Sequence, residues 1–235
     1  MPYQVYADKE SASQAVFELF KEELSTNPQT VFGLATGSTP EKLYQLLRES
    51  DLDFSQATSI NLDEYYGLPA DHPQSYHYFM QKELFAAKPF RASYLPDGST
   101  DNPQAEVKAY EAIIDQNPIQ VQILGIGHNG HIGFNEPGSP FDSLTRLVDL
   151  TQSTIEANQR FFDSIDEVPT QALSMGIASI MKADKVILMA FGEEKSKIVQ
   201  AALEGPVTEE VPASVLQNHP NALFILDQAA AKYLK

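Results

Sequence analysis

From Ile119 to Gly138 the chain runs IQVQILGIGHNGHIGFNEPG. The first six residues are mostly apolar and partly β-branched, which predicts a buried strand. The remainder holds five glycines, two histidines, two asparagines and a glutamate, which predicts a loop at the carboxyl end of that strand. Ligands bind at this end of the strands in open α/β sheets. Since glycine lets a backbone approach a ligand, and histidine and glutamate carry protons, we expect a loop that takes part in chemistry.

Apolar, β-rich runs alternate with helical patterns along the whole chain. The predicted strands are a first one from about Tyr3 and then 30–35, 57–63, 119–125, 185–191 and 222–226. The predicted helices are an amphipathic one after Tyr6, then 40–48, 74–87, 102–116, 153–162 and 193–203, and a short one after the last strand. This alternation predicts an α/β fold, a doubly wound, mostly parallel, Rossmann-like sheet with helices on both faces. We see no repeat or dividing linker, so we expect a single domain over 1–235.

The composition restricts the classes of function. Of 235 residues, 43% are hydrophobic and 20% charged, as in a globular protein. There is no cysteine, so disulfides and thiol catalysis are excluded, and a cytoplasmic location fits. No signal-peptide pattern or long apolar run is present, so we expect no membrane contact. The net charge of −16 argues against a nucleic-acid partner. An anionic ligand would need a local site of backbone N–H groups and placed cations.

A first candidate site is the turn at residues 33–41, with the sequence GLATGSTPE. A predicted strand enters this turn and a predicted helix leaves it, with Pro40 in the first helical turn. Gly37, the hydroxyls of Ser38 and Thr39, and the N–H groups of the helix start together suit a phosphate. The alternative is an ordinary helix cap, since Ser and Thr are common capping residues.

A second candidate site is the adjacent carboxylate pair Asp63 and Glu64, in the sequence INLDEYYGL at 60–68. Successive side chains of a strand point to opposite sides, so one carboxylate can face a crevice while the other faces structure. A partly desolvated carboxylate is a stronger proton acceptor, as carbon-acid chemistry requires. The alternative is an exposed acidic turn.

Three cations lie near predicted sheet-end loops: Arg146, Arg160 and Lys195. Lys195 falls in the first turn of a predicted helix, where a cation opposes the helix dipole unless an anion binds there. Its alternative is a solvated surface position. Arg146 and Arg160 flank a segment of irregular pattern, 147–162, which is a candidate mobile cover.

The histidines raise the question of a metal site. His128, His131 and Glu136 form a His-x-x-His-x4-Glu set that could ligate zinc. However, a glycine-rich loop does not fix this spacing as a helix would, and no third strong ligand recurs nearby. We therefore expect no metal.

Four motifs together carry a family resemblance: GLATGSTP at 33–40, NLDEY at 61–65, GIGHNGHIGFNEP at 125–137 and NQRFF at 158–162. In this order they resemble the glucosamine-6-phosphate deaminase family, and the combination is specific although each piece is weak. The resemblance implies a reversible, cofactor-independent conversion of glucosamine 6-phosphate to fructose 6-phosphate and ammonium. The implied partner is a small-molecule sugar phosphate.

The resemblance also implies residue roles. His131 would move the ring-opening proton, with Glu136 and Asn129 orienting it, and Asp63 would take the proton from C2 to form an enolamine. The phosphate would contact the turn of Gly37, Ser38 and Thr39, with positive charge added by Arg160 and Lys195. Tyr76 falls where the family has an aromatic residue near the site.

Two positions depart from the family pattern. Many members have Asp where this chain has Asn129, so a strict carboxylate–imidazole relay is in doubt, although Asn can fix the tautomer of His131. Longer, hexameric members carry a basic residue two positions beyond Arg146, which binds an allosteric sugar phosphate. Here that residue is Val148. We therefore expect no allosteric control, and a monomer.

Two rival functions share the expected fold. A 6-phosphogluconolactonase has a similar His loop but needs no base for C2, so the sequence DEYYG at 63–67 and FNEP at 134–137 favour the deaminase. A sugar-phosphate sensor would bind without turnover and would be expected to carry a DNA-binding domain, whereas this chain begins its first strand at about Tyr3.

Overall fold

A seven-stranded parallel sheet lies at the centre of the computed structural model, which describes residues 2–159, 162 and 164–235. The strand order is β1-β10-β9-β6-β2-β3-β5, and all six pairings are parallel. The bounds are β1 (Tyr3–Tyr6), β2 (Val31–Leu34), β3 (Thr58–Asn61), β5 (Ala92–Tyr94), β6 (Val121–Leu124), β9 (Lys185–Ala190) and β10 (Ala222–Asp227). The predicted parallel α/β fold is confirmed.

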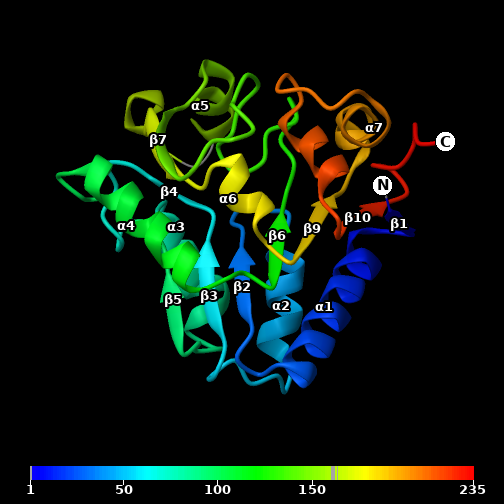
Figure 1. Cartoon of the computed structure of the whole chain (residues 1–235), viewed down its shortest axis with the longest axis horizontal. Helices are drawn as coiled ribbons and strands as arrows, with labels where there is room; N and C mark the ends of the chain where they lie inside the picture. Colours follow the sequence, from blue (N-terminus) through cyan, green and yellow to red (C-terminus); the bar gives the residue numbers. More distant parts are fainter. Residues whose placement is uncertain (1, 160–161, 163) are drawn as a thin grey trace.

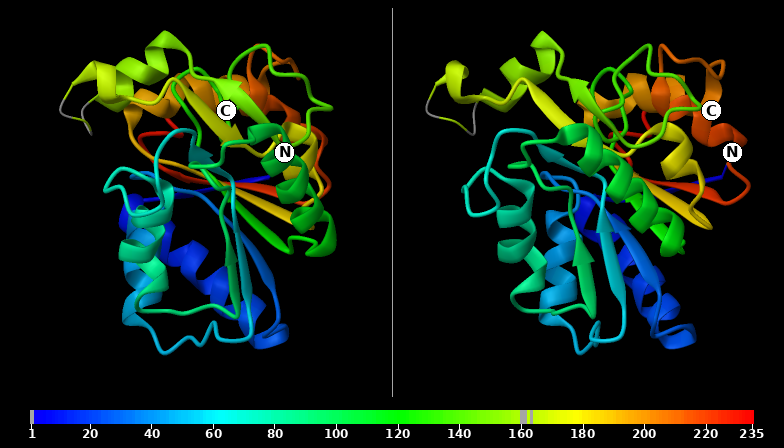
Figure 2. Two further views of the ribbon diagram at one scale, coloured as in Figure 1. Left: turned by 90° about the vertical axis from the view of Figure 1, so that its left-hand side faces the viewer. Right: turned by 60° about the vertical axis from the view of Figure 1, so that its left-hand side comes forward.

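Helices cover both faces of this sheet (Figure 2). One face carries α1 (Lys9–Thr26), α2 (Glu41–Glu49) and α3 (Tyr76–Met80), which continues as a π-helix, η1 (Gln81–Phe85). The other face carries α4 (Pro103–Gln116), α6 (Ile177–Met181), α7 (Ser196–Glu204) and the 3₁₀ helix η5 (Pro212–Asn218). A 3₁₀ turn, η4 (Glu193–Lys195), directly precedes α7. In the hydrophobic core between the sheet and α1, the rings of Phe20 and Phe32 stack with centroids 4.4 Å apart. No helix in the described ranges is long and apolar enough to cross a membrane.

A second, antiparallel sheet has the order β4-β8-β7. Its strands are β4 (Asp63–Tyr65), β8 (Gln171–Ser174) and β7 (Arg146–Asp149). With α5 (Gln152–Asn158), it lies over the carboxyl ends of β2, β3 and β6 (Figure 1). Leu62 joins the two sheets, because its N–H donates to Leu34 O and its carbonyl accepts from the N–H of Met175. The chain therefore changes sheets one residue before Asp63.

The structure corrects several sequence-based boundaries. The strand predicted over 57–63 is two strands, β3 and β4, separated at Leu62. The segment 147–162, which had no regular pattern, holds most of β7 and all of α5, and α5 ends at Asn158, before the predicted end at 162. The short helix predicted after the last strand is a run of turns. There Asp227 Oδ1 accepts the Ala230 N–H and Asp227 O accepts the Ala231 N–H, but the bonds that follow span three residues, so a regular α-helix does not continue from this capped turn.

Candidate active site

The loop after β6 folds tightly around His131. The Gly127 N–H donates to His131 O at 2.9 Å, and Gly130, with φ of 91°, adopts a conformation that favours glycine. A Cβ on Gly127 would lie 2.2 Å from the imidazole of His131. Gly127 must therefore be glycine for the ring to lie where it does.

Asn129 links His131 to Glu136. Its Nδ2 donates to Glu136 Oε2 at 2.6 Å, and its Oδ1 lies 2.8 Å from His131 Nδ1. Since a carboxylate only accepts, the amide nitrogen must face Glu136 and the amide oxygen must face the imidazole. An amide oxygen also only accepts, so Nδ1 carries the proton of the neutral ring. The unprotonated Nε2 of His131 is therefore the nitrogen that can accept a proton.

Glu136 is a buried, ionised carboxylate. Burial by itself would raise its pKa, but hydrogen bonds and positive charge from His131, with hydrogen bonds from Thr154 and Asn129, lower the pKa to about 2. Thr154, on α5, donates its hydroxyl to Glu136 Oε1. Glu136 Oε2 lies 3.5 Å from His131 Nδ1, so the carboxylate also faces the imidazole directly.

Asp63 lies beside the same loop. It begins β4, pairs with Ser174 on β8 and is 6% exposed. Its Oδ2 lies 3.5 Å from the place where a Cβ of Gly133 would be, two residues beyond His131. The Phe134 N–H donates to Ser174 Oγ at 3.1 Å, which fixes the loop against β8. The sheet crossing at Leu62 thus places the Asp63 carboxylate against the loop that carries His131.

The carboxylate pair is unusually basic. Burial, followed by the neighbouring charge of Glu64, raises the pKa of Asp63 to about 8. Burial also raises the pKa of Glu64, to about 7, although three backbone N–H donors oppose the rise. Glu64 therefore ionises first, and Asp63 holds its proton up to a higher pH.

The predicted phosphate turn lies next to the loop after β6. Gly37 has a φ of 86°, and Pro40, the residue that precedes α2, provides no side-chain cap for the first N–H groups of the helix. A Cβ on Gly125 would lie 3.6 Å from Thr39 Oγ1, which places the turn of Gly37, Ser38 and Thr39 against the end of β6. Backbone donors at a helix start suit an anion.

The predicted cations occupy different places. Lys195, in η4, donates to Ile126 O at 2.8 Å and so lies on the loop beside the phosphate turn. Arg146 donates to Asn135 Oδ1 at 2.8 Å and to Ser139 Oγ at 3.2 Å, so it fixes the segment after β6 to β7. Arg160 lies outside the residues that the structure describes.

Tyr76 joins an aromatic cluster above the loop. Its ring lies 4.7 Å from that of Tyr65 and 6.0 Å from that of Phe134, with the planes of Tyr76 and Phe134 only 3° apart. Phe134 belongs to the loop after β6, so Tyr76 borders the candidate site.

Three contributing residues were missed from the sequence. Thr154 and Ser174 hold the loop, and Lys9 donates to Ser38 O at 2.6 Å in the phosphate turn. Lysine, serine and threonine are frequent surface residues, and only tertiary contacts distinguish these three.

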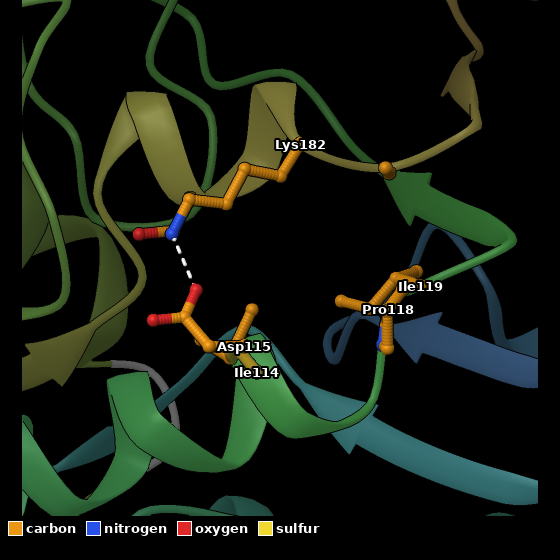
Figure 3. A pocket seen from close by; sticks show the side chains of 7 residues that line it. Ile114, Asp115, Pro118, Ile119 and Lys182 are labelled. Atoms are coloured by element: carbon orange, nitrogen blue, oxygen red, sulfur yellow. Dashed lines mark hydrogen bonds and ion pairs between the residues drawn. The ribbon is translucent and has the colours of Figure 1, made fainter.

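A partly open pocket of about 140 Å³ lies away from this site (Figure 3). Ile119 and Ala183, which line it, precede β6 and β9, so it lies at the amino ends of these strands. Lys182 on its rim is paired with Asp115 at 2.7 Å. Within the described ranges, no group of three or more His, Asp or Glu side chains is arranged for a metal.

We predict that Asp63→Asn stabilises the protein increasingly as pH rises. An aspartate with a folded pKa of about 8 binds its proton more tightly in the folded state than in the unfolded state, so its ionisation costs stability between about pH 4 and pH 8. Asn removes this cost, which is on the order of 1 kcal/mol per pKa unit. Urea unfolding at pH 5 and pH 9 measures the difference.

The control is Glu136→Gln, which should destabilise the protein at neutral pH, whereas Asp63→Asn should stabilise it. The pKa of Glu136 is lowered to about 2, so its charge stabilises the fold at neutral pH and this contribution is lost only as pH falls toward 2. Equal effects of Asp63→Asn at pH 5 and pH 9 would contradict the assignment of a raised pKa.

Comparison with known proteins places this chain in a family. The model of glucosamine-6-phosphate isomerases/6-phosphogluconolactonase matches residues 7–225. A glucosamine-6-phosphate deaminase of Oenococcus oeni is 56% identical over 234 residues, covering 100% of this chain and 99% of that protein. One of Lactobacillus helveticus is 58% identical over 230 residues, covering 98% and 96%.

Solved structures agree. A monomeric glucosamine-6-phosphate deaminase of the NagB superfamily superposes with a TM-score of 0.93 at 38% identity, covering 99% of both chains. The 6-phosphogluconolactonase of Trypanosoma brucei has a TM-score of 0.83 at 20% identity, covering 100% of this chain and 98% of its own, which shows a shared fold alone. From the match over residues 7–225 and the near full-length relatives, the chain belongs to the glucosamine-6-phosphate isomerase/6-phosphogluconolactonase family.

Proposed function

We propose that this protein is a glucosamine-6-phosphate deaminase, which converts glucosamine 6-phosphate and water to fructose 6-phosphate and ammonia. The relatives at 56% and 58% identity bear that name. Within the family, the observation that carries the proposal is the Asp63 carboxylate beside Gly133, on the same loop as His131. An isomerisation needs a carbon base of this kind, whereas hydrolysis of a lactone does not.

His131 opens the sugar ring. Its Nε2 accepts the proton of the anomeric hydroxyl and delivers it to the ring oxygen, which leaves an aldehyde at C1. Asn129 holds the tautomer that makes Nε2 the acceptor, and ionised Glu136 stabilises the imidazolium that forms in between. The charge that a carboxylate at position 129 would supply thus comes from Glu136.

Asp63 then transfers a proton between carbons. Its carboxylate takes the proton from C2, and the oxygen on C1 takes up a proton from the ammonium group of the substrate, which gives the enolamine. Asp63 then returns its proton at C1, which leaves a protonated imine at C2. Water adds to that imine and ammonia departs. Burial makes Asp63 a strong base, and its ionised form, which the deamination direction requires, becomes populated as pH rises through about 8.

The phosphate would lie in the turn of Gly37, Ser38 and Thr39, with Lys195 beside it and Arg160 as a further cation. The turn and Lys195 both contact the segment of Gly125 and Ile126, so they can act on one group. Phosphate binding far from the reacting carbons supplies energy that orients them. Tyr76 would form an aromatic wall near the sugar.

We also propose that the protein acts as a monomeric, cytoplasmic enzyme of one domain that takes no cofactor. The solved relative at 38% identity is described as monomeric, and Val148 stands where longer members carry an allosteric basic residue. Sedimentation should give a mass near 26.0 kDa, and N-acetylglucosamine 6-phosphate should leave the substrate curve hyperbolic.

The function is tested by ammonium release from glucosamine 6-phosphate, coupled to detection of fructose 6-phosphate. Galactosamine 6-phosphate tests the choice of epimer, and 6-phosphogluconolactone tests the rival hydrolase. Lactone hydrolysis without ammonium release would reject the proposal, and so would binding of sugar phosphate without turnover.

We predict that Asp63→Asn lowers kcat by three or more orders of magnitude and leaves substrate binding largely intact, because only the proton transfer at C2 is lost. Exchange of the C2 proton with deuterated water, followed by NMR, reports on that step directly. Near-normal exchange in the variant would remove Asp63 from this role.

We predict that His131→Gln impairs the closed-ring substrate far more than an open-chain analogue, because glutamine cannot relay a proton between the two sugar oxygens. The measurement is kcat/KM for both substrates in both proteins. Equal losses on the two substrates would contradict a role in ring opening.

A further inference from the structure

Glu64 is a buried carboxylate that the proposed mechanism does not use. It is 2% exposed, and its two oxygens accept three backbone hydrogen bonds. Oε1 accepts from the N–H groups of Tyr65, at 2.8 Å, and Tyr76, at 2.9 Å, and Oε2 accepts from the N–H of His77 at 2.8 Å. The carboxylate thus ties β4 to the first residues of α3.

The segment after β5 covers the side chain of Glu64 and shields it from solvent. A Cβ on Gly98 would lie 2.2 Å from Tyr65 O and 3.1 Å from Glu64 Cγ, so only glycine allows this approach. The Gly67 N–H donates to Gly98 O at 2.7 Å, which holds the two segments together. Water is therefore excluded from Glu64, and its charge acts on its neighbours with little screening.

The charges around the pair come from several elements. Asp63 precedes Glu64 on β4, and Tyr65 follows it. Tyr76 and His77 are presented by α3, and Tyr110 on α4 lies close enough to both carboxylates that their charges raise its pKa further. In the part of the chain that the structure describes, neither carboxylate forms an ion pair with a lysine or arginine. No cation therefore neutralises Glu64 there.

We propose that Glu64 is a positioning residue of the deaminase site, whose buried carboxylate ties the start of α3, which carries Tyr76, to β4 and stands next to Asp63 in that strand. The proposal rests on the proposed function for its kinetic readout alone.

Two consequences follow from two properties of the same side chain. Its charge makes Asp63 a stronger base, which helps removal of the C2 proton. Its length and two oxygens fix the start of α3 and, through it, the ring of Tyr76 against Phe134. A substitution that removes only one property should change only one of the readouts.

The first test is Glu64→Gln, which removes the charge and keeps the side-chain length and one accepting oxygen. We expect the midpoint of the pH profile of kcat/KM to move down by about one pH unit or more, because a negative charge near Asp63 is lost. The matched variant is Glu64→Asp, which keeps the charge and shortens the reach to α3. It should raise KM severalfold and move the midpoint much less.

Glu111→Gln is the control for loss of a buried carboxylate. Glu111 accepts from Thr145 N at 3.0 Å, Ser179 Oγ at 2.7 Å and Lys182 Nζ at 2.8 Å, near the pocket of Figure 3. Its replacement is expected to lower stability without moving the pH midpoint. A merely structural role for Glu64 would give this same result.

A second readout does not depend on activity. The ¹³C chemical shift of the Asp63 carboxyl, assigned by its absence in Asp63→Asn, reports its titration in the folded protein. We expect this titration to move to lower pH in Glu64→Gln. An unchanged titration would overturn the proposal even if deaminase activity is present, and a moved titration without ammonium release would uphold it while rejecting the proposed function.

Discussion

The burial of two adjacent carboxylates where the sheets meet is the constraint on which this site depends. Asp63 and Glu64 are 6% and 2% exposed, and desolvation of a carboxylate is costly unless hydrogen bonds or cations compensate it. Three backbone N–H groups compensate Glu64, whereas no hydrogen bond from the described residues reaches the carboxylate of Asp63. The fold thus places the larger cost of ionisation on the side chain that the proposed reaction requires to be basic.

Glu136 is the opposite case, because its surroundings lower its pKa whereas those of Asp63 raise it. Asp63 and Glu136 are therefore suited to different roles. Hydrogen bonds from Asn129 and Thr154, together with the nearby His131, keep Glu136 ionised at neutral pH. Groups of one chemical type with pKa values pushed apart by their surroundings can serve as proton carrier and as fixed charge. The amide of Asn129 fits this division, because it transmits orientation to His131 while Glu136 supplies the charge.

The parallel sheet and the candidate catalytic residues could be predicted because their signals are local. Strands buried on both faces are continuous apolar runs, and His131 and Glu136 share one loop. The half-exposed strands β5 and β7 lack such runs, so they were missed. The sheet crossing at Leu62 was also missed, because it depends on hydrogen bonds to Leu34 and Met175, residues distant in the sequence. Contacts of that kind also bring Thr154, Ser174 and Lys9 to the candidate site, and no spacing along the chain reveals them.

An acidic protein that binds an anionic substrate needs positive groups close to the binding site to offset the repulsion between the two. With a net charge of −16, the long-range field repels a sugar phosphate, but at physiological salt charges beyond about 8 Å are largely screened. Lys9 and Lys195 are hydrogen-bonded to the carbonyls of Ser38 and Ile126, in and next to the proposed phosphate turn, and the uncapped start of α2 adds backbone dipoles. Because the backbone already positions both ammonium groups, a phosphate bound at the proposed turn would cost little reorganisation. Its binding energy would then be available to orient the sugar toward the proposed catalytic residues.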